Sequence, residues 1–183
     1  MPKKNETKTL FTEKWFDVIE IDGKVGIHNK HMSVAVLPFT NDENGMVKEI
    51  GILHEPNPFR EGGFCDTLIT GTVEYEDDSL LLTAIRELEE EGGIAVPPTE
   101  NARWIFLGTI YPYKDGDRMV PVFAADVTGL EVKEPQGDGT EKEAMAKFSF
   151  EEVGRGIASD EALVLSSFLR LFNYMYAKSM NYV

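Results

Sequence analysis

The chain has 183 residues, 42% hydrophobic and 27% charged, a composition typical of one compact domain with a buried core. Its 32 acidic and 18 basic residues give a formal net charge of −14, which repels nucleic acid and argues against it as a partner. The lone cysteine, Cys65, excludes an internal disulfide, and no apolar stretch reaches membrane-spanning length. We therefore expect one cytoplasmic domain over residues 1–183, without a membrane or nucleic-acid partner.

Predicted strands dominate the N-terminal half of the chain. Aromatic and β-branched residues mixed with polar ones from Lys8 to Ile21, followed by the turn sequence Asp22-Gly23-Lys24, predict an N-terminal β arm over residues 1–27. Turn residues and prolines then separate three short apolar runs that favour buried strands, at residues 32–39, 49–54 and 67–70.

The C-terminal half combines helices with strands. A helix is predicted from about Asp78 to Glu91, because Gly92-Gly93 supplies a typical helix end. A final helix over about residues 159–178 has apolar residues at helical spacing along one face. Between them we expect strands at 104–111, 120–127 and 146–150, and a mobile polar loop at 133–143. The pattern predicts an α+β fold, an α/β/α sandwich in which helices flank a mixed central sheet.

Three glutamates occupy one face of the first predicted helix. Glu87, Glu90 and Glu91 stand at positions i, i+3 and i+4, whereas Glu89 points away from them. Like charges at these spacings repel one another and destabilise a helix, and the negative end of the helix dipole at the C-terminus adds to this repulsion. A hard divalent cation removes it, and Mg²⁺ (or Mn²⁺) also binds phosphate oxygens. The alternative is a solvated acidic surface with no bound ion.

The residues around these glutamates resemble the signature of the Nudix hydrolases. That signature reads Gly, five residues, Glu, seven residues, Arg-Glu, an aliphatic, any residue, Glu-Glu, any residue, Gly and an aliphatic. Here Gly71 and Asp78 precede Arg86-Glu87-Leu88-Glu89-Glu90-Glu91-Gly92-Gly93-Ile94, with six residues between Gly71 and the acid. The whole motif covers residues 71–94, and its second half, from Arg86 to Ile94, matches at every fixed position. The resemblance implies the Nudix-like sandwich fold and an ion pair between Arg86 and Asp78.

Within that family, the chain looks like the branch of ADP-ribose pyrophosphatases and nucleoside diphosphate sugar hydrolases. The likeness rests on the tryptophan-containing arm, an arginine ahead of the motif, a Tyr-Pro-Tyr sequence after it, an acidic loop and a closing helix. The run Thr67-Leu68-Ile69-Thr70-Gly71 lacks the glutamate and proline that the branch commonly has there. This resemblance implies a homodimer that hydrolyses the pyrophosphate bond of ADP-ribose or a related nucleotide sugar.

The resemblance also implies roles for individual residues. Arg86 would orient the carboxylates, and a carboxylate of the acidic loop, Glu141 or Glu143, would act as general base. The expected metal ligands are Glu87, Glu90, Glu91 and a backbone carbonyl, that of Thr70 or Gly71, and the expected substrate-binding residues are Arg60, Trp15 and Tyr113.

Two other functions remain open from the sequence alone. A nucleotide-sensing protein on the same fold has no need of a complete carboxylate cluster, and the cluster therefore argues against it. An enzyme of the same family that acts on nucleoside triphosphates or dinucleoside polyphosphates uses the same motif, and only residues outside the motif distinguish it. Roles outside substrate binding also remain open: Trp15 as a packing residue and Arg60 as an exposed loop cation.

Overall fold

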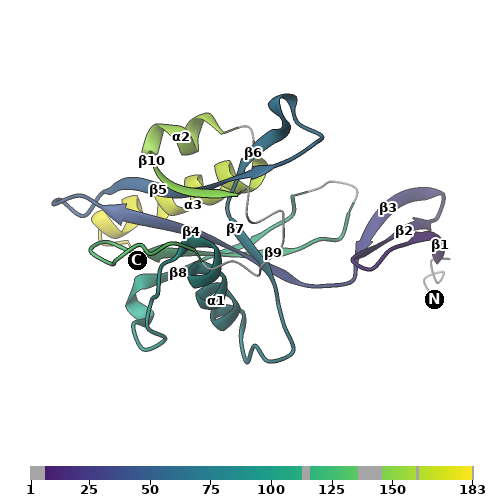
Figure 1. Cartoon of the computed structure of the whole chain (residues 1–183), viewed down its shortest axis with the longest axis horizontal. Coiled ribbons are helices and arrows are strands. Elements are labelled where there is room, and N and C mark those ends of the chain that lie inside the picture. Colours follow the sequence, from purple (N-terminus) through teal and green to yellow (C-terminus); the bar gives the residue numbers. More distant parts are fainter. Residues whose placement is uncertain (1–6, 113–115, 136–145, 160, 183) are drawn as a thin grey trace.

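The N-terminal arm is a small antiparallel sheet that projects from the body of the protein (Figure 1). The computed structural model describes residues 7–112, 116–135, 146–159 and 161–182. The arm consists of β1 (Thr7–Thr12), β2 (Phe16–Ile21) and β3 (Lys24–Asn29). The predicted turn at Asp22 and Gly23 is confirmed, since both residues have positive φ values, of 52° and 80°, as tight hairpins require. The third strand extends the predicted arm.

The central sheet is mixed, as predicted. Its main path runs β10-β5-β4-β9-β8, and β4 pairs with β9 in parallel while its other pairings are antiparallel. The strands are β4 (Ser33–Asn41), β5 (Val47–Pro56), β6 (Phe64–Thr67), β7 (Ile69–Thr72), β8 (Trp104–Ile110), β9 (Val120–Asp126) and β10 (Lys147–Glu152).

The single strand predicted over residues 67–70 is two short strands. β6 pairs with β5, whereas β7 pairs with β4, so the chain passes from one neighbour to the other at Leu68. Leu68 is fully buried at this crossing. A local apolar pattern does not reveal such a change of partner, because both halves carry the same β signal.

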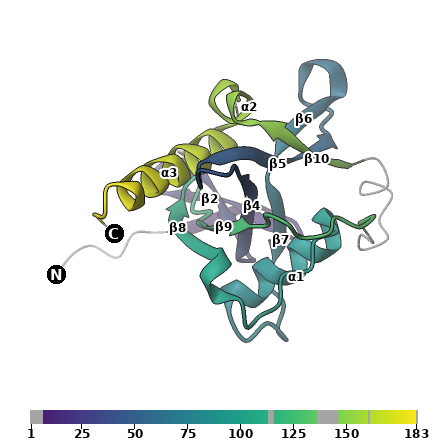
Figure 2. The same cartoon turned by 90° about the vertical axis from the view of Figure 1, so that its left-hand side faces the viewer.

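Helices cover both faces of the central sheet (Figures 1 and 2), which confirms the α+β sandwich. The helix α1 (Leu80–Gly92) packs over the core that includes Val34, Ile69 and Leu88. On the other face, α3 (Ala162–Ser179) packs with Phe168 and Leu171 buried. A short helix that the sequence does not predict, α2 (Val153–Ala158), precedes α3, and two short 3-10 turns span Glu61–Gly63 and Asn101–Arg103. None of the helices described is long and apolar enough to cross a membrane.

Two residues define the limits of α1. Ser79 caps its start, where the Oγ atom accepts a hydrogen bond from the backbone N–H of Leu82 at 3.3 Å. Gly93 ends it in the left-handed conformation, with φ of 66°. A Cβ atom at Gly93 would lie 2.0 Å from the carbonyl oxygen of Lys133, so glycine is also required for this close approach. The helix thus begins two residues after the predicted start and ends one residue after the predicted end.

The pairing of β7 places the predicted motif at the border of the sheet. Ser33 pairs with Thr72 and Val34 pairs with Gly71, so β4 lies along one side of β7. No other described strand pairs with β7, and α1 packs beside it. The backbone groups of β7 that do not face β4 are therefore available to the side chains of α1.

Candidate functional site

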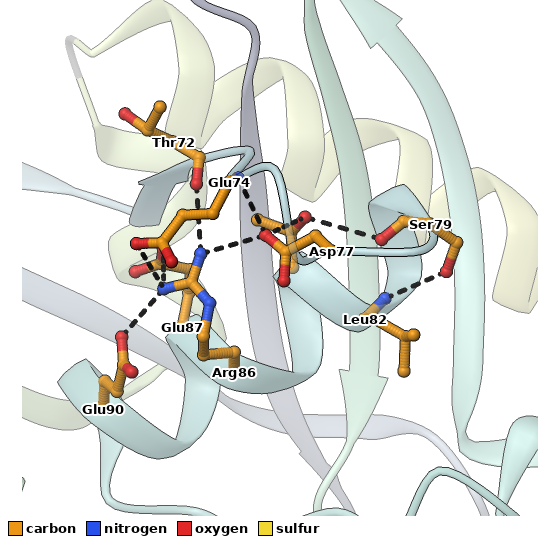
Figure 3. Close-up of polar contacts among 9 residues, drawn as sticks. Thr72, Glu74, Asp77, Ser79, Leu82, Arg86, Glu87 and Glu90 are labelled. Atoms are coloured by element: carbon orange, nitrogen blue, oxygen red, sulfur yellow. Dashed lines mark hydrogen bonds and ion pairs between the residues drawn. The ribbon is translucent and has the colours of Figure 1, made fainter.

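Arg86 lies at the centre of the polar cluster between α1 and β7 (Figure 3). Its Nη1 atom lies 2.7 Å from Oε1 of Glu87 and 2.9 Å from Oε2 of Glu90. Its Nη2 atom donates a hydrogen bond to the backbone carbonyl of Thr72 at 3.0 Å. One guanidinium thus joins the glutamate helix to the border of the sheet and fixes the distance between them.

The acid that pairs with Arg86 is Asp77, and the implied pair with Asp78 is wrong. Nη2 of Arg86 lies 3.2 Å from Oδ2 of Asp77, which also accepts hydrogen bonds from Thr83 Oγ1 at 2.9 Å and from the amide of Glu74 at 3.0 Å. Asp78 is exposed instead. Burial opposes ionisation, but these donors outweigh it and hold the pKa of Asp77 below its usual value.

The spacing of the motif from Gly71 also indicates Asp77 as the acid that pairs with Arg86. Five residues separate Gly71 from Asp77, as in the family signature, so the extra residue lies between Asp77 and Arg86. Counting back from Arg86 instead selects Asp78. The choice depends on where the helix starts, because Ser79 caps it and Asp77 precedes the cap.

Glu87 is the most deeply placed carboxylate of the cluster. It is 7% exposed and lies against Gly71, where a Cβ atom would come within 1.7 Å of the Glu87 carboxyl carbon. Burial raises the pKa of Glu87 to about 7, although the charge of Arg86 acts in the opposite direction. Gly71 is therefore required by packing, since any larger residue takes the space of this carboxylate.

Residues of β7 direct backbone polar groups toward α1. The amide of Thr70 donates a hydrogen bond to Oε2 of Glu91 at 3.3 Å, and the carbonyl of Thr72 accepts from Arg86. In a strand, the N–H and C=O groups of one residue point to the same side. The carbonyl of Thr70 therefore faces the same border of the sheet as the glutamates.

The cluster carries more negative than positive charge. Four carboxylates, those of Glu74, Asp77, Glu87 and Glu90, lie within 4.0 Å of Arg86. When all four are ionised, one guanidinium leaves three negative charges without compensation. Burial strengthens the repulsion, and this is the kind of environment that a divalent cation stabilises.

The carboxylates are engaged by protein groups in this arrangement. Arg86 stands between Glu87 and Glu90, and Glu91 is turned toward the amide of Thr70. Within the described part of the chain, no three His, Cys, Asp or Glu side chains are gathered into a ready-made metal site. Glu89, which the sequence predicts to point away, is exposed. The donor set fits a hard cation in chemistry and charge, but the side chains must turn from Arg86 to reach one.

The predicted substrate-binding arginine, Arg60, makes no contact with the glutamate cluster among those described. It stands in the loop between β5 and β6, and its guanidinium pairs with the carboxylate of Glu161, directly before α3. This ion pair joins the loop to the beginning of the helix. The charge of Arg60 is thus already compensated by the protein.

Trp15 lies on the arm, between β1 and β2. Its ring is half exposed, packs edge-on against His31 with centroids 5.1 Å apart, and lies under the ammonium of Lys14. Because the arm projects from the body (Figure 1), no described contact brings this ring to the glutamates of the same chain. The remaining predicted residues, Tyr113, Glu141 and Glu143, lie outside the described residues.

Comparison with known proteins agrees with this architecture. The model of the NUDIX domain family matches residues 29–171, which excludes most of the arm. A solved structure titled as the crystal structure of an ADP compounds hydrolase is similar, with a TM-score of 0.66 and 16% sequence identity over 97% of this chain and 95% of that chain. At this identity the likeness concerns the fold alone. No curated protein matches the sequence.

Proposed function

The chain belongs to the NUDIX domain family, and we propose that it is a metal-dependent pyrophosphohydrolase acting on a nucleoside diphosphate linked to another group. ADP-ribose or a related nucleotide sugar is the proposed substrate, and Mg²⁺ (or Mn²⁺) the proposed cofactor. The observation that carries this proposal is Glu87, a buried carboxylate in a cluster that holds three negative charges in excess when all four of its carboxylates are ionised. Such a cluster is unfavourable without a cation and suits phosphoryl chemistry with one.

We propose that Glu87, Glu90, Glu91 and the backbone carbonyl of Thr70 hold the cation. The direction of the Thr70 carbonyl, inferred from the hydrogen bond that the Thr70 N–H donates to Glu91, supports its place in this set. When bound, the cation supplies charge neutralisation to the diphosphate and activates water for attack. Arg86 retains Asp77 and the Thr72 carbonyl as partners when the glutamates turn away, so it keeps α1 in position.

The proposed reaction adds water to one phosphorus of the diphosphate. A phosphorus–oxygen bond forms to the water oxygen, the bond to the bridging oxygen breaks, and the bridging oxygen leaves with the second phosphate. The water proton goes to a carboxylate that is not a metal ligand, because a ligated carboxylate is a poor base. Glu141 and Glu143 remain the predicted candidates for this role.

The wider predictions from the sequence remain part of this proposal. We treat residues 1–183 as one catalytic domain, with the arm as an extension of it. Arg60, Trp15 and Tyr113 remain predicted substrate-binding residues. A homodimer is consistent with the exposed apolar side chains of the arm, which include Leu10, Phe11 and Val25. The cytoplasmic location and the absence of nucleic-acid and membrane partners also remain predictions.

A hydrolysis panel with magnesium tests the proposed function. The substrates are ADP-ribose, nucleotide sugars, dinucleoside polyphosphates and nucleoside triphosphates, and AMP or phosphate release is measured with and without chelator. Glu90→Gln and Glu91→Gln keep the side-chain shape and remove a ligand charge, so we expect turnover to fall by about two orders of magnitude or more.

Glu89→Gln is the matched control, because Glu89 is on the same helix but exposed. It removes the same charge from α1 at a position that is not a proposed ligand, and turnover should stay near the wild-type rate. Equal losses in all three variants contradict the ligand assignment. Absence of any cation-dependent hydrolysis by the folded wild-type protein contradicts the function.

A further inference from the structure

Two arginines, Arg118 and Arg170, form no ion pair with a carboxylate among the described residues, and Arg118 is the more buried of the two. The chain has six arginines, and the structure describes all of them. Arg170 donates hydrogen bonds to two backbone carbonyls of β8, of Leu107 and Thr109. Four others form ion pairs with carboxylates: Arg60 with Glu161, Arg86 with the glutamate cluster, Arg103 with Glu100, and Arg155 with Asp66.

Arg118 has only a neutral partner among the described residues. Its Nη2 atom donates a hydrogen bond to the hydroxyl of Ser33 at 3.1 Å, and Ser33 is 9% exposed. No ion pair joins Arg118 to a carboxylate in the part of the chain that is described. A half-buried guanidinium gains strongly from an anionic partner. Within the described residues, the charge of Arg118 is therefore not compensated by a carboxylate, in a protein whose formal net charge is −14.

The main chain at Arg118 is held in place by the arm. The amide of the preceding residue, Asp117, donates to the carbonyl of Ile27 at 3.1 Å, and its Oδ1 atom accepts from the amide of Asn29 at 2.8 Å. His28 adds a side-chain contact to the same carboxylate. Gly116, two residues before Arg118, also forms an isolated parallel bridge with Ile27 of β3. The backbone before Arg118 is thus anchored to the arm, and its guanidinium to Ser33, which lowers the entropy that binding must overcome.

The pairing of β4 with β7 places Arg118 close to the glutamate cluster. Ser33, its partner, is directly opposite Thr72. The carbonyl of Thr72 is the group that accepts a hydrogen bond from Arg86. Neighbouring strands are about 4.8 Å apart. Arg118 and Arg86 therefore meet the same end of the β4–β7 pair from opposite faces of the sheet, because Val34 packs with α1 and the side chain of the neighbouring Ser33 projects to the other face.

We propose that Arg118 binds a phosphate oxygen of the substrate's diphosphate, at the end of the β4–β7 pair and on the face of the sheet opposite α1. This inference rests on the proposed function for the identity of the anion. A guanidinium presents paired N–H donors that match two phosphate oxygens, and Ser33 occupies only one side of it. The cation and Arg118 would then hold the diphosphate from two sides across the border of the sheet.

Three variants separate binding by charge from a structural role. Arg118→Gln removes the charge, Arg118→Lys keeps it without the paired donors, and Ser33→Ala removes the neutral partner alone. The readouts are kcat and KM for the best substrate of the panel, and the Kd of ADP with magnesium by calorimetry. Thermal unfolding verifies that each variant is folded.

We expect Arg118→Gln to raise KM and the Kd of ADP by about ten- to a hundredfold, as for the loss of a charged hydrogen bond, with kcat changed less than about threefold. Arg118→Lys should recover part of the loss, and Ser33→Ala should change the Kd less than about threefold. Equal effects of Ser33→Ala and Arg118→Gln overturn the inference, because they assign Arg118 a structural role.

Two further outcomes distinguish this inference from the proposed function. If no substrate of the panel is hydrolysed but ADP binding still depends on Arg118, the proposed function fails and the anion site stands. If the folded wild-type protein binds no ADP, or if Arg60→Gln weakens binding while Arg118→Gln does not, the inference is overturned.

Discussion

Glu87 makes the stability of the metal-free protein depend on pH in an unusual direction. Its pKa in the folded protein is about 7, against 4.5 for an unperturbed glutamate, because burial disfavours the charged form. The folded state therefore binds this proton more tightly than the unfolded state. Its contribution to stability is complete below about pH 4.5 and is lost as the pH rises toward 7 and above.

The size of the effect follows from the same two values. Each unit of difference in pKa corresponds to about 1.4 kcal/mol, so ionising Glu87 in the folded protein costs up to about 3 kcal/mol of stability above pH 7. Carboxylates with lowered pKa, such as Asp77, change the stability only below about pH 4. They therefore do not contribute to the change in stability between pH 5 and pH 8. Between pH 5 and pH 8, the free energy of unfolding should thus fall by about 2 to 3 kcal/mol through Glu87.

Urea unfolding of the wild-type protein and of Glu87→Gln, in chelator at pH 5, 6, 7 and 8, measures this difference. Glutamine stays neutral, so the variant should lack this part of the pH dependence and be more stable than the wild type at pH 8. Comparing the two proteins removes the effect of every other titrating group. A constant difference between them across the four pH values refutes the reasoning, because Glu87 then has similar pKa values in both states.

Further predictions concern the groups around Glu87. Gly71→Ala should lower magnesium-dependent activity at least tenfold, because its Cβ takes the space of the Glu87 carboxylate; activity and thermal unfolding are measured together. Asp77→Asn should destabilise the protein by about 1 to 3 kcal/mol in urea unfolding, because it weakens the charged hydrogen bonds that Oδ2 of Asp77 accepts from Arg86, Thr83 and the amide of Glu74, whereas Asp78→Asn should change stability by less than about 0.5 kcal/mol. Magnesium should raise the melting temperature of the wild-type protein in proportion to site occupancy. One of Glu141→Gln and Glu143→Gln should lower kcat strongly, with little change in metal affinity, and flatten the acidic limb of the pH–rate profile.

Each of these predictions has an outcome that contradicts it. Equal stability of Asp77→Asn and Asp78→Asn removes Asp77 from its role beside Arg86. Normal activity of Gly71→Ala means that the Glu87 carboxylate moves without loss of function. A melting temperature indifferent to millimolar magnesium favours the solvated acidic surface. Wild-type turnover in both loop variants and in their double variant places the general base elsewhere.

Local sequence signals were sufficient for the helix and most of the strands. α1 is bounded by Ser79 and Gly93, a side chain and a backbone conformation that act within one turn of the chain. The strands β4, β5, β8 and β9 follow from short apolar runs between turn residues. The short helix α2 was missed, since Gly154 and Gly156 give its six residues little helical signal. The final helix begins at Ala162 rather than 159, because the backbone of Glu161 is extended.

The motif itself was also readable from the sequence. Glu87, Glu90 and Glu91 share a helix face because of the 3.6-residue period, which depends on no distant part of the chain. The family resemblance rests on the same short segment, and the family match over residues 29–171 confirms it. A function class that resides in one helix is therefore determined by the sequence alone.

Contacts between distant segments were decided only by the tertiary structure. Arg86 selects Asp77 over its neighbour Asp78 because the loop before Ser79 directs only one of the two carboxylates inward. Arg60 meets Glu161, a hundred residues later, and Arg118 meets Ser33 across the sheet. Arginines of one chain thus differ in whether a carboxylate of the protein already compensates their charge. This depends on which strands and loops lie beside each of them. Sequence patterns describe neighbours along the chain, whereas the strength of an ionic contact depends on neighbours in space.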